Sequence, residues 1–147
     1  MDKIDNQLIQ LLGENARQSS YRLATKLKLS PTTVRRRIRK LIQSGVLRIV
    51  ATVDPDKVGF PLSAIIGFDV DQDKVNSALQ ALASMPEVKW LSTSTGQFDL
   101  LALTRFRSPD ELSDFLQKEL TGIKGLKNTE TFICLRVEKG KHMRVIT

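Results

Sequence analysis

Residues 30–41 read Ser-Pro-Thr-Thr-Val-Arg-Arg-Arg-Ile-Arg-Lys-Leu and carry a clear signal for the start of a helix. Ser30 suits the N-cap, and Pro31 suits the first helical turn, where its missing backbone N–H costs no hydrogen bond. The apolar residues recur at helical spacing and form one inward face: Val34, Ile38 and Leu41. The pattern predicts a helix over 31–42 that stops before Gly45, a residue suited to left-handed backbone.

The other side of this predicted helix is crowded with positive charge. Five of the six residues from Arg35 to Lys40 are cationic, and no acid occurs between Ser30 and Val53. Like charges at helical spacing repel one another, so the face indicates a surface that meets a polyphosphate. A helix fits the major groove of double-stranded DNA, where Arg binds guanine and Thr contacts the thymine methyl. The expected DNA-binding residues are Thr32, Thr33, Arg35, Arg36, Arg37, Arg39 and Lys40.

We expect these residues to have different roles on DNA. Arg36 and Thr32 project directly away from the apolar face, so we expect them to read bases. The other cations are expected to contact phosphates, with Arg17 and Arg22 as additions. The alternative interpretation is a basic face that is merely solvated.

Two further helices are predicted before residue 30, and together the three form a helix-turn-helix. The first opens at Asp2 and closes near Gly13, with apolar residues at Ile4, Leu8, Leu11 and Leu12. The second is capped by Ser19 or Ser20, and its inner face is Leu23, Ala24 and Leu27. Residues 1–50 carry a charge balance of +8, whereas residues 51–147 carry −1. The sequence therefore predicts a cationic module joined to a nearly neutral one.

Residues 46–53 are rich in β-branched side chains and predict a strand that leaves the first module, as in a winged helix-turn-helix. Asp54-Pro55 and Gly59-Phe60-Pro61 then supply turn residues. The predicted organisation is a helix-turn-helix domain with a trailing strand over 1–53, a hinge or linker over 54–61 and a second domain over 62–147.

The second domain is predicted to be a ferredoxin-like βαββαβ unit, which makes the whole chain α+β. The expected strands are 62–70, 88–95, 98–105 and 128–137, and the expected helices are 74–84 and one that opens at the capping box Ser108-Pro109-Asp110-Glu111. In this fold both helices lie on one face of the sheet. The other face is therefore uncovered within one chain.

The predicted strands nevertheless carry apolar residues on both faces. One face of the first strand is Leu62, Ala64, Ile66, Phe68 and Val70, with Ile65 on the other. Phe98, Leu100 and Ala102 oppose Leu101 and Leu103, while Ile133, Leu135 and Val137 oppose Phe132 and Cys134. We expect a second copy of the chain to cover the uncovered face. Such a homodimer would place two helices in successive major grooves of double-stranded DNA.

The composition argues against several classes of protein. The chain has 147 residues with one cysteine, Cys134, and one histidine, His142. These counts leave no intrachain disulfide, no cysteine zinc site and no Ser-His-Asp set, so we expect no catalytic residue, no metal and no cofactor. There is no apolar run of transmembrane length and no secretory signal, which predicts no membrane partner and a cytoplasmic, nucleoid-associated location.

Several motifs, in their order and spacing, make the chain similar to the Lrp/AsnC (feast/famine) transcription regulators. They include Leu29-Ser30-Pro31-Thr32-Thr33-Val34, Val53-Asp54-Pro55, Thr95-Gly96-Gln97-Phe98-Asp99 and Thr129-Glu130-Thr131. The resemblance covers nearly the whole chain. It implies a DNA-binding transcription regulator, dimers that assemble into octamers or related rings, and control by an amino acid or a similar small metabolite.

The resemblance also implies an effector site. Family effector sites lie near the turn between the second and third strands, which points to Gly96, Gln97, Phe98 and Asp99, with Thr129 and Thr131 opposite. Many members have Gly-Asp-Tyr-Asp at this turn, and Gln97 and Phe98 remove one acid and one phenol. Gly96-Gln97 is alternatively a plain hairpin turn. Two other functions stay open: a sirohaem-decarboxylase-like enzyme of the same layout, and an architectural DNA-binding protein of low specificity.

Overall fold

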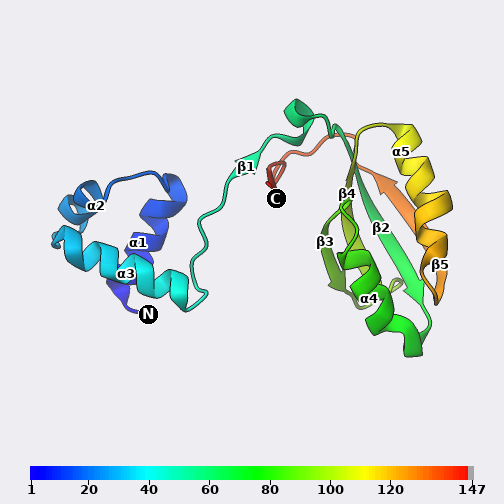
Figure 1. Cartoon of the computed structure of the whole chain (residues 1–147), viewed down its shortest axis with the longest axis horizontal. Coiled ribbons are helices and arrows are strands. Elements are labelled where there is room, and N and C mark those ends of the chain that lie inside the picture. The colour runs from blue at the N-terminus through cyan, green and yellow to red at the C-terminus, as the bar shows by residue number, and fades with distance from the viewer. Residues whose placement is uncertain (146–147) are drawn as a thin grey trace. The chain divides into compact units, whose positions relative to one another are not determined.

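A computed structural model describes residues 1–145, and the chain divides into two units between Ala51 and Thr52 (Figure 1). Each unit has its own hydrophobic core. The division lies just before the predicted linker over 54–61, and that segment belongs to the second unit. It contains a 3-10 helix, Pro55–Val58, whose Pro55 is buried. The last two residues of the predicted second domain, 146 and 147, lie outside the described residues.

The first unit consists of three helices: α1 (Lys3–Glu14), α2 (Ser20–Leu27) and α3 (Pro31–Gln43). Their apolar faces meet in one core, as the periodicity predicts; its buried members are Leu8, Leu12, Leu23, Ala24, Val34 and Leu41. Ser19 caps α2 by accepting a hydrogen bond from the Arg22 amide, and Ser30 caps α3 by accepting one from the Thr33 amide. The predicted three-helix arrangement is confirmed.

An ion-pair cluster joins the start of α1 to α3. Asp2 and Asp5 form a capping box, in which each carboxylate accepts from the other residue's backbone amide. Arg37 Nη1 lies 2.7 Å from Asp2 Oδ2 and 2.8 Å from Asp5 Oδ1. The backbone amide of Asp2, followed by the Arg37 side chain, lowers the pKa of Asp5, and the Asp5 amide together with Arg37 likewise lowers the pKa of Asp2. Both carboxylates are therefore held in the charged form.

The predicted strand over 46–53 forms only in its last two residues. Strand β1 (Thr52–Val53) pairs antiparallel with β6 (Met143–Arg144), and both belong to the second unit. Residues 46–51 form no strand, so the described part of the first unit has no wing. Val46 and Ile49 are at least half exposed. β-branched residues favour strand backbone, but a strand persists only with a partner to bond its amides and carbonyls, and this segment has none.

The second unit is built on a four-stranded antiparallel sheet with the strand order β3-β4-β2-β5. The strands are β2 (Leu62–Val70), β3 (Val88–Thr93), β4 (Leu100–Phe106) and β5 (Leu126–Ile133). The helices are α4 (Val75–Ala83), preceded by the 3-10 turn Gln72–Lys74, and α5 (Pro109–Asp114), which continues through the π-helical Phe115–Glu119 and the 3-10 turn Leu120–Gly122. This is the predicted ferredoxin-like order.

Both helices cover the same face of the sheet. Ala64, Ile66, Phe68 and Val70 of β2 pack in one core with residues of α4 and of the α5 segment. The alternation predicted for β2 is confirmed, since these side chains are buried while Ile65, on the other face, is 39% exposed. We call the face without helices the open face.

Cross-strand pairing builds an apolar row across the open face. Trp90 pairs with Leu103, Leu103 with Ile65, and Ile65 with Phe132, so the row spans all four strands. Three members remain well exposed in the chain: Ile65 at 39%, Trp90 at 52% and Phe132 at 48%. The structure thus leaves a continuous apolar surface where the sequence predicts one.

Phe98 lies on the open face, whereas the sequence predicts it beside Leu100 and Ala102 on the other face. A Cβ built on Gly67 would lie 2.5 Å from the Phe98 ring, so the ring occupies the space beside this glycine. The prediction for Phe98 is wrong because β4 begins at Leu100, and strand alternation does not extend back into the turn. The last strand likewise ends at Ile133, four residues before the predicted end.

The ion-pair cluster of Asp2, Asp5 and Arg37 generates a pH dependence confined to the first unit. A carboxyl with a lowered pKa stabilises the folded state above its unfolded pKa, near 3.9, and this contribution is lost as the pH falls through the lower folded value. We expect Asp5→Asn to reduce hydrogen-exchange protection of the α1 and α3 amides several-fold at pH 7. Below pH 4, where protection of these amides falls in the wild type, the fall should be smaller in this variant.

Asp114→Asn is the matched control, because it removes an exposed ion pair to Lys118 in the second unit. Protection in α1 and α3 should not change in this variant. Equal protection in Asp5→Asn and wild type at pH 7 would contradict a role for the cluster in holding α1 to α3.

Candidate nucleic-acid interface

Helix α3 is fixed at both ends by the residues that the sequence singles out. Three residues separate it from α2, and the first of them, Lys28, ends α2 in the left-handed conformation with φ of 54°. The Leu29 amide donates to the Ala24 carbonyl and closes the turn. At the far end, Gly45 has φ of 74°, as its predicted stop requires. The short turn between two helices is that of a helix-turn-helix.

Five of the predicted DNA-binding residues are exposed along the outer side of α3: Thr32, Arg35, Arg36, Arg39 and Lys40. Arg35 Nη2 donates to Thr32 Oγ1 at 3.3 Å, which links two of these side chains. Within residues 1–145, no carboxylate forms an ion pair with any of the four cations in this set. We call these five residues the basic face of α3. Its charge is uncompensated by the described chain.

Thr33 and Arg37, the other two predicted contacts, are partly buried and already have partners. The Thr33 hydroxyl lies 2.8 Å from the Ser30 hydroxyl at the start of the helix. The Arg37 guanidinium is held by Asp2 and Asp5, and its Nε is buried without a partner among the described residues. The structure therefore gives both side chains a role in positioning α3.

A groove that the sequence does not indicate runs beside the basic face. It has a volume of about 350 Å³ and is lined by Ser20, Arg35, Ile38, Arg39, Ile42 and Gln43. Ser20 comes from α2 and the other residues come from α3. Only tertiary packing of the two helices brings Ser20 to this surface, so periodicity along one helix carries no signal for it.

The turn over residues 94–99 is tied to strand β2. The Asp99 amide donates to the Phe68 carbonyl at 2.9 Å, and Asp99 Oδ2 accepts from the Val70 amide at 2.8 Å. Gly96 has φ of 98°, so the turn needs a residue without a side chain there. Gly96 and Gln97 are exposed. The Asp99 carboxylate already accepts from a backbone amide of β2, as a structural aspartate would.

Thr129 and Thr131 of β5 are not brought together with this turn on one face of the sheet. Thr129 pairs with Phe68 and Thr131 with Ile66, and both partners lie in the helix-covered core. Phe98 lies on the open face beside Gly67. Paired residues of neighbouring antiparallel strands share a face, so the six residues of the expected effector site divide between the two sides.

None of the helices within residues 1–145 is both long and apolar enough to cross a membrane. In the same part of the chain, no group of three or more His, Cys, Asp or Glu residues is placed to hold a metal ion.

Comparison with known proteins assigns a family to each unit. Residues 1–42 match the AsnC-type helix-turn-helix domain, and residues 63–143 match the Lrp/AsnC ligand binding domain. An HTH-type transcriptional regulator of Pyrococcus furiosus is 34% identical over 146 residues, which cover 99% of each chain.

Solved structures give the same assignment. AsnC from E. coli matches with a TM-score of 0.89 and 29% identity, over 99% of this chain and 97% of that one. A transcriptional regulator from Neisseria meningitidis, solved as a complex with L-Met, matches with a TM-score of 0.88 and 26% identity, over 96% and 94% of the two chains. With a helix-turn-helix DNA-binding domain and a ligand-binding domain in that order, this chain belongs to the Lrp/AsnC family of transcriptional regulators.

Proposed function

We propose that the protein is a sequence-specific regulator that binds double-stranded DNA as a homodimer or a higher oligomer and responds to an amino acid or a similar small metabolite. The basic face of α3 carries the DNA-binding part of this proposal. Its four cations are exposed and have no acidic partner within residues 1–145, so DNA phosphates can neutralise them without breaking an existing ion pair.

The geometry of α3 supports a division of roles along the basic face. Thr32 and Arg36 lie close to the direction opposite the buried Val34, which places them nearest the floor of a groove. Arg35, Arg39 and Lys40 lie toward the sides and would face the phosphate backbone. Arg37 is left out of the proposed contacts because Asp2 and Asp5 already neutralise it.

The apolar row across the open face supports the homodimer. Trp90, Ile65 and Phe132 are each more than one-third exposed, and they are joined through Leu103 into one surface. A second copy related by a two-fold axis would present the same row and cover this one. The assembly of dimers into octamers is part of the proposal on family grounds.

The effector part of the proposal rests on the family and on the exposed turn. The Neisseria relative was solved with L-Met, and residues 63–143 match the ligand binding domain of the family. Within one chain the turn at Gly96 and Gln97 is accessible, while Thr129 and Thr131 lie on the other side of the sheet. A complete site would therefore combine the turn of one chain with residues of another copy.

We expect Arg36→Ala and Arg39→Ala to affect DNA binding differently. Arg36→Ala removes a base reader and should reduce discrimination at one base position by about 1–3 kcal/mol. Arg39→Ala removes a phosphate contact and should weaken binding to all sequences. It should also reduce the magnitude of the slope of log affinity against log salt by about one. Selection of binding sites from a random DNA library, followed by salt titration, measures both effects.

The matched control is Lys124→Ala, which removes an exposed cation from the second unit and should leave both quantities unchanged. Equal losses in the two α3 variants, with no change in base preference, would contradict the division of roles. Wild-type affinity that is equal for selected and random DNA would instead indicate an architectural DNA-binding protein.

We expect Phe132→Asp to split the homodimer, because it places a charge in the apolar row, at the end that lies on β5. Sedimentation velocity of the full chain at micromolar concentration should then show a monomer. Thr93→Asp is the control: Thr93 is an exposed strand residue that pairs with Leu100 and so lies on the other face. Unchanged sedimentation of Phe132→Asp would place the dimer interface elsewhere.

We expect at least one of the twenty amino acids to change the affinity for a selected DNA site by about fivefold or more, the usual range of coupling between two ligands. Gln97→Ala should reduce that response, since Gln97 is exposed at the proposed site. Gln117→Ala, at an exposed position of the segment after α5, should not. If every amino acid leaves the affinity within twofold, the regulator acts without an amino-acid effector.

A further inference from the structure

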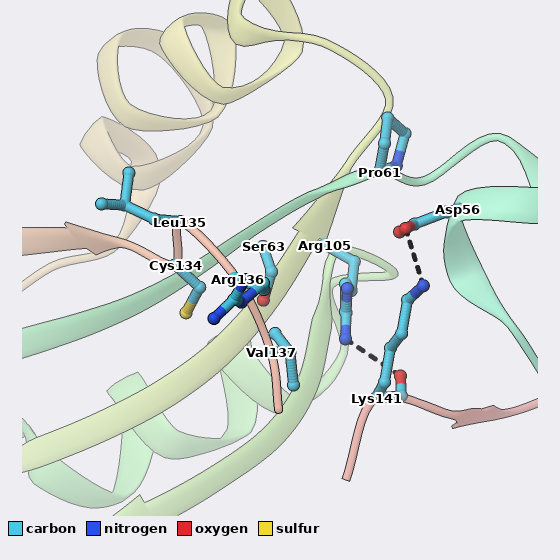
Figure 2. Close-up of a pocket in the computed structure, with 9 residues that line it drawn as sticks. All are labelled: Asp56, Pro61, Ser63, Arg105, Cys134, Leu135, Arg136, Val137 and Lys141. Carbon is cyan, nitrogen blue, oxygen red and sulfur yellow. Dashed lines mark hydrogen bonds and ion pairs between the residues drawn. The ribbon is translucent and has the colours of Figure 1, made fainter. Parts of the chain in front are cut away.

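A small polar cavity lies at one end of the open face, away from the turn over residues 94–99. It has a volume of about 150 Å³ and is lined by Asp56, Pro61, Ser63, Arg105, Cys134, Leu135, Arg136, Val137 and Lys141 (Figure 2). Ser63 lies at the start of β2, whereas the turn contacts Phe68 and Val70 near the end of that strand. The cavity is therefore distinct from the expected effector site.

Strand pairing explains why Ser63 and Arg105 meet in this cavity. They are direct partners across β2 and β4, and they share the open face with the next pair along, Ile65 and Leu103. Side chains of such a pair stand about 5 Å apart at their Cβ atoms. One hydroxyl and one guanidinium thus point into the same space.

The C-terminal segment covers this pair and buries it. Arg105 Nη2 donates to the Lys141 carbonyl at 3.0 Å, as Figure 2 shows. Lys141 is held in place by its own side chain, whose Nζ lies 3.2 Å from an Asp54 oxygen and 2.8 Å from an Asp56 oxygen. As a result Arg105 is only 3% exposed and Ser63 only 2% exposed.

Neither buried side chain is fully satisfied by the described chain. The Ser63 hydroxyl has no hydrogen-bond partner within residues 1–145. Over the same residues Arg105 forms no ion pair with a carboxylate, and only one of the five N–H groups of its side chain donates a hydrogen bond. A buried charge without a counter-charge is unfavourable, and an unpaired buried hydroxyl adds to the cost. Both defects would be corrected by one acceptor that carries negative charge.

The other two cations of the cavity lining already have carboxylate partners. Lys141 is paired with Asp54 and Asp56, and Arg136 is paired with Glu138. Among the cations that line the cavity, Arg105 is therefore the one without a carboxylate partner within residues 1–145. An anion in the cavity can pair with this guanidinium without displacing an existing ion pair.

We propose that this cavity binds a small carboxylate, with the Arg105 guanidinium and the Ser63 hydroxyl as its donors. A guanidinium matches a carboxylate through two parallel N–H bonds, and a hydroxyl can donate a third. The volume admits an anion of only a few heavy atoms, and Pro61 and Val137 give a short alkyl group apolar contact. This site is independent of the proposed DNA binding and of the proposed effector turn.

The test uses thermal unfolding of the full chain without DNA, at fixed ionic strength in chloride. The single tryptophan, Trp90, lies on β3, so its fluorescence follows the second unit. Acetate or propionate at ten times the dissociation constant should raise the midpoint of that transition by roughly 5 °C. Arg105→Met should abolish the shift, and Ser63→Ala should reduce it.

Arg107→Met is the matched control, since it removes an exposed arginine two residues along the chain and outside the cavity lining; its shift should equal that of wild type. In chloride alone, Arg105→Met should unfold at or above the wild-type temperature, because it removes an uncompensated buried charge. Ser63→Ala keeps the proposal testable if Arg105→Met does not fold.

Three results would overturn the proposal. The first is a wild-type transition that neither carboxylate moves, and the second is a shift that persists in Arg105→Met. The third is a larger shift with inorganic phosphate, which would assign the cavity to a different anion. If the first result comes together with dissociation of the dimer in Arg105→Met, the anion that pairs with Arg105 is an acidic side chain of a second copy and not a free carboxylate.

Discussion

Helix α3 has to pack against two other helices while it carries five cations within six positions, and the described chain supplies acidic partners to only one of them. That one is Arg37, on the side of the helix that faces α1. The capping box of α1 thus has two roles, since Asp2 and Asp5 cap the start of their own helix and also hold the helix beside it. The remaining positive charge is left on the outer side, where a polyanion can meet it.

The second unit is governed by a different constraint, the two faces of a single sheet. Helices α4 and α5 cover one face, and the described residues of this unit supply no further helix for the other. The open face therefore combines an apolar row in its middle with a polar cavity at one end, where the C-terminal segment covers Ser63 and Arg105. Both the surface for another copy and the pocket for an anion exist because α4 and α5 do not cover this face.

The sequence predicts those parts of the structure that depend on local signals. Ser30, Pro31 and Gly45 mark the ends of α3, and period-two alternation assigns Ala64, Ile66 and Phe68 to the core. It fails where distant segments decide the outcome. Arg37 meets acids more than thirty residues away, and residues 46–51 of the strand predicted over 46–53 have no partner. Phe98 belongs to a turn and not to the strand after it. Arg105 carries no signal in the sequence because burial of a strand arginine depends on which segment crosses over it.

The contact between Gly67 and Phe98 has an evolutionary consequence. The aromatic ring fills the space that any side chain at position 67 would need, so an alanine there fits only beside a smaller residue at position 98. Asp99, the next residue, is bonded to the backbone of the same strand, so the loop has little freedom to move aside. In related proteins, position 67 can therefore gain a side chain only together with a change at position 98.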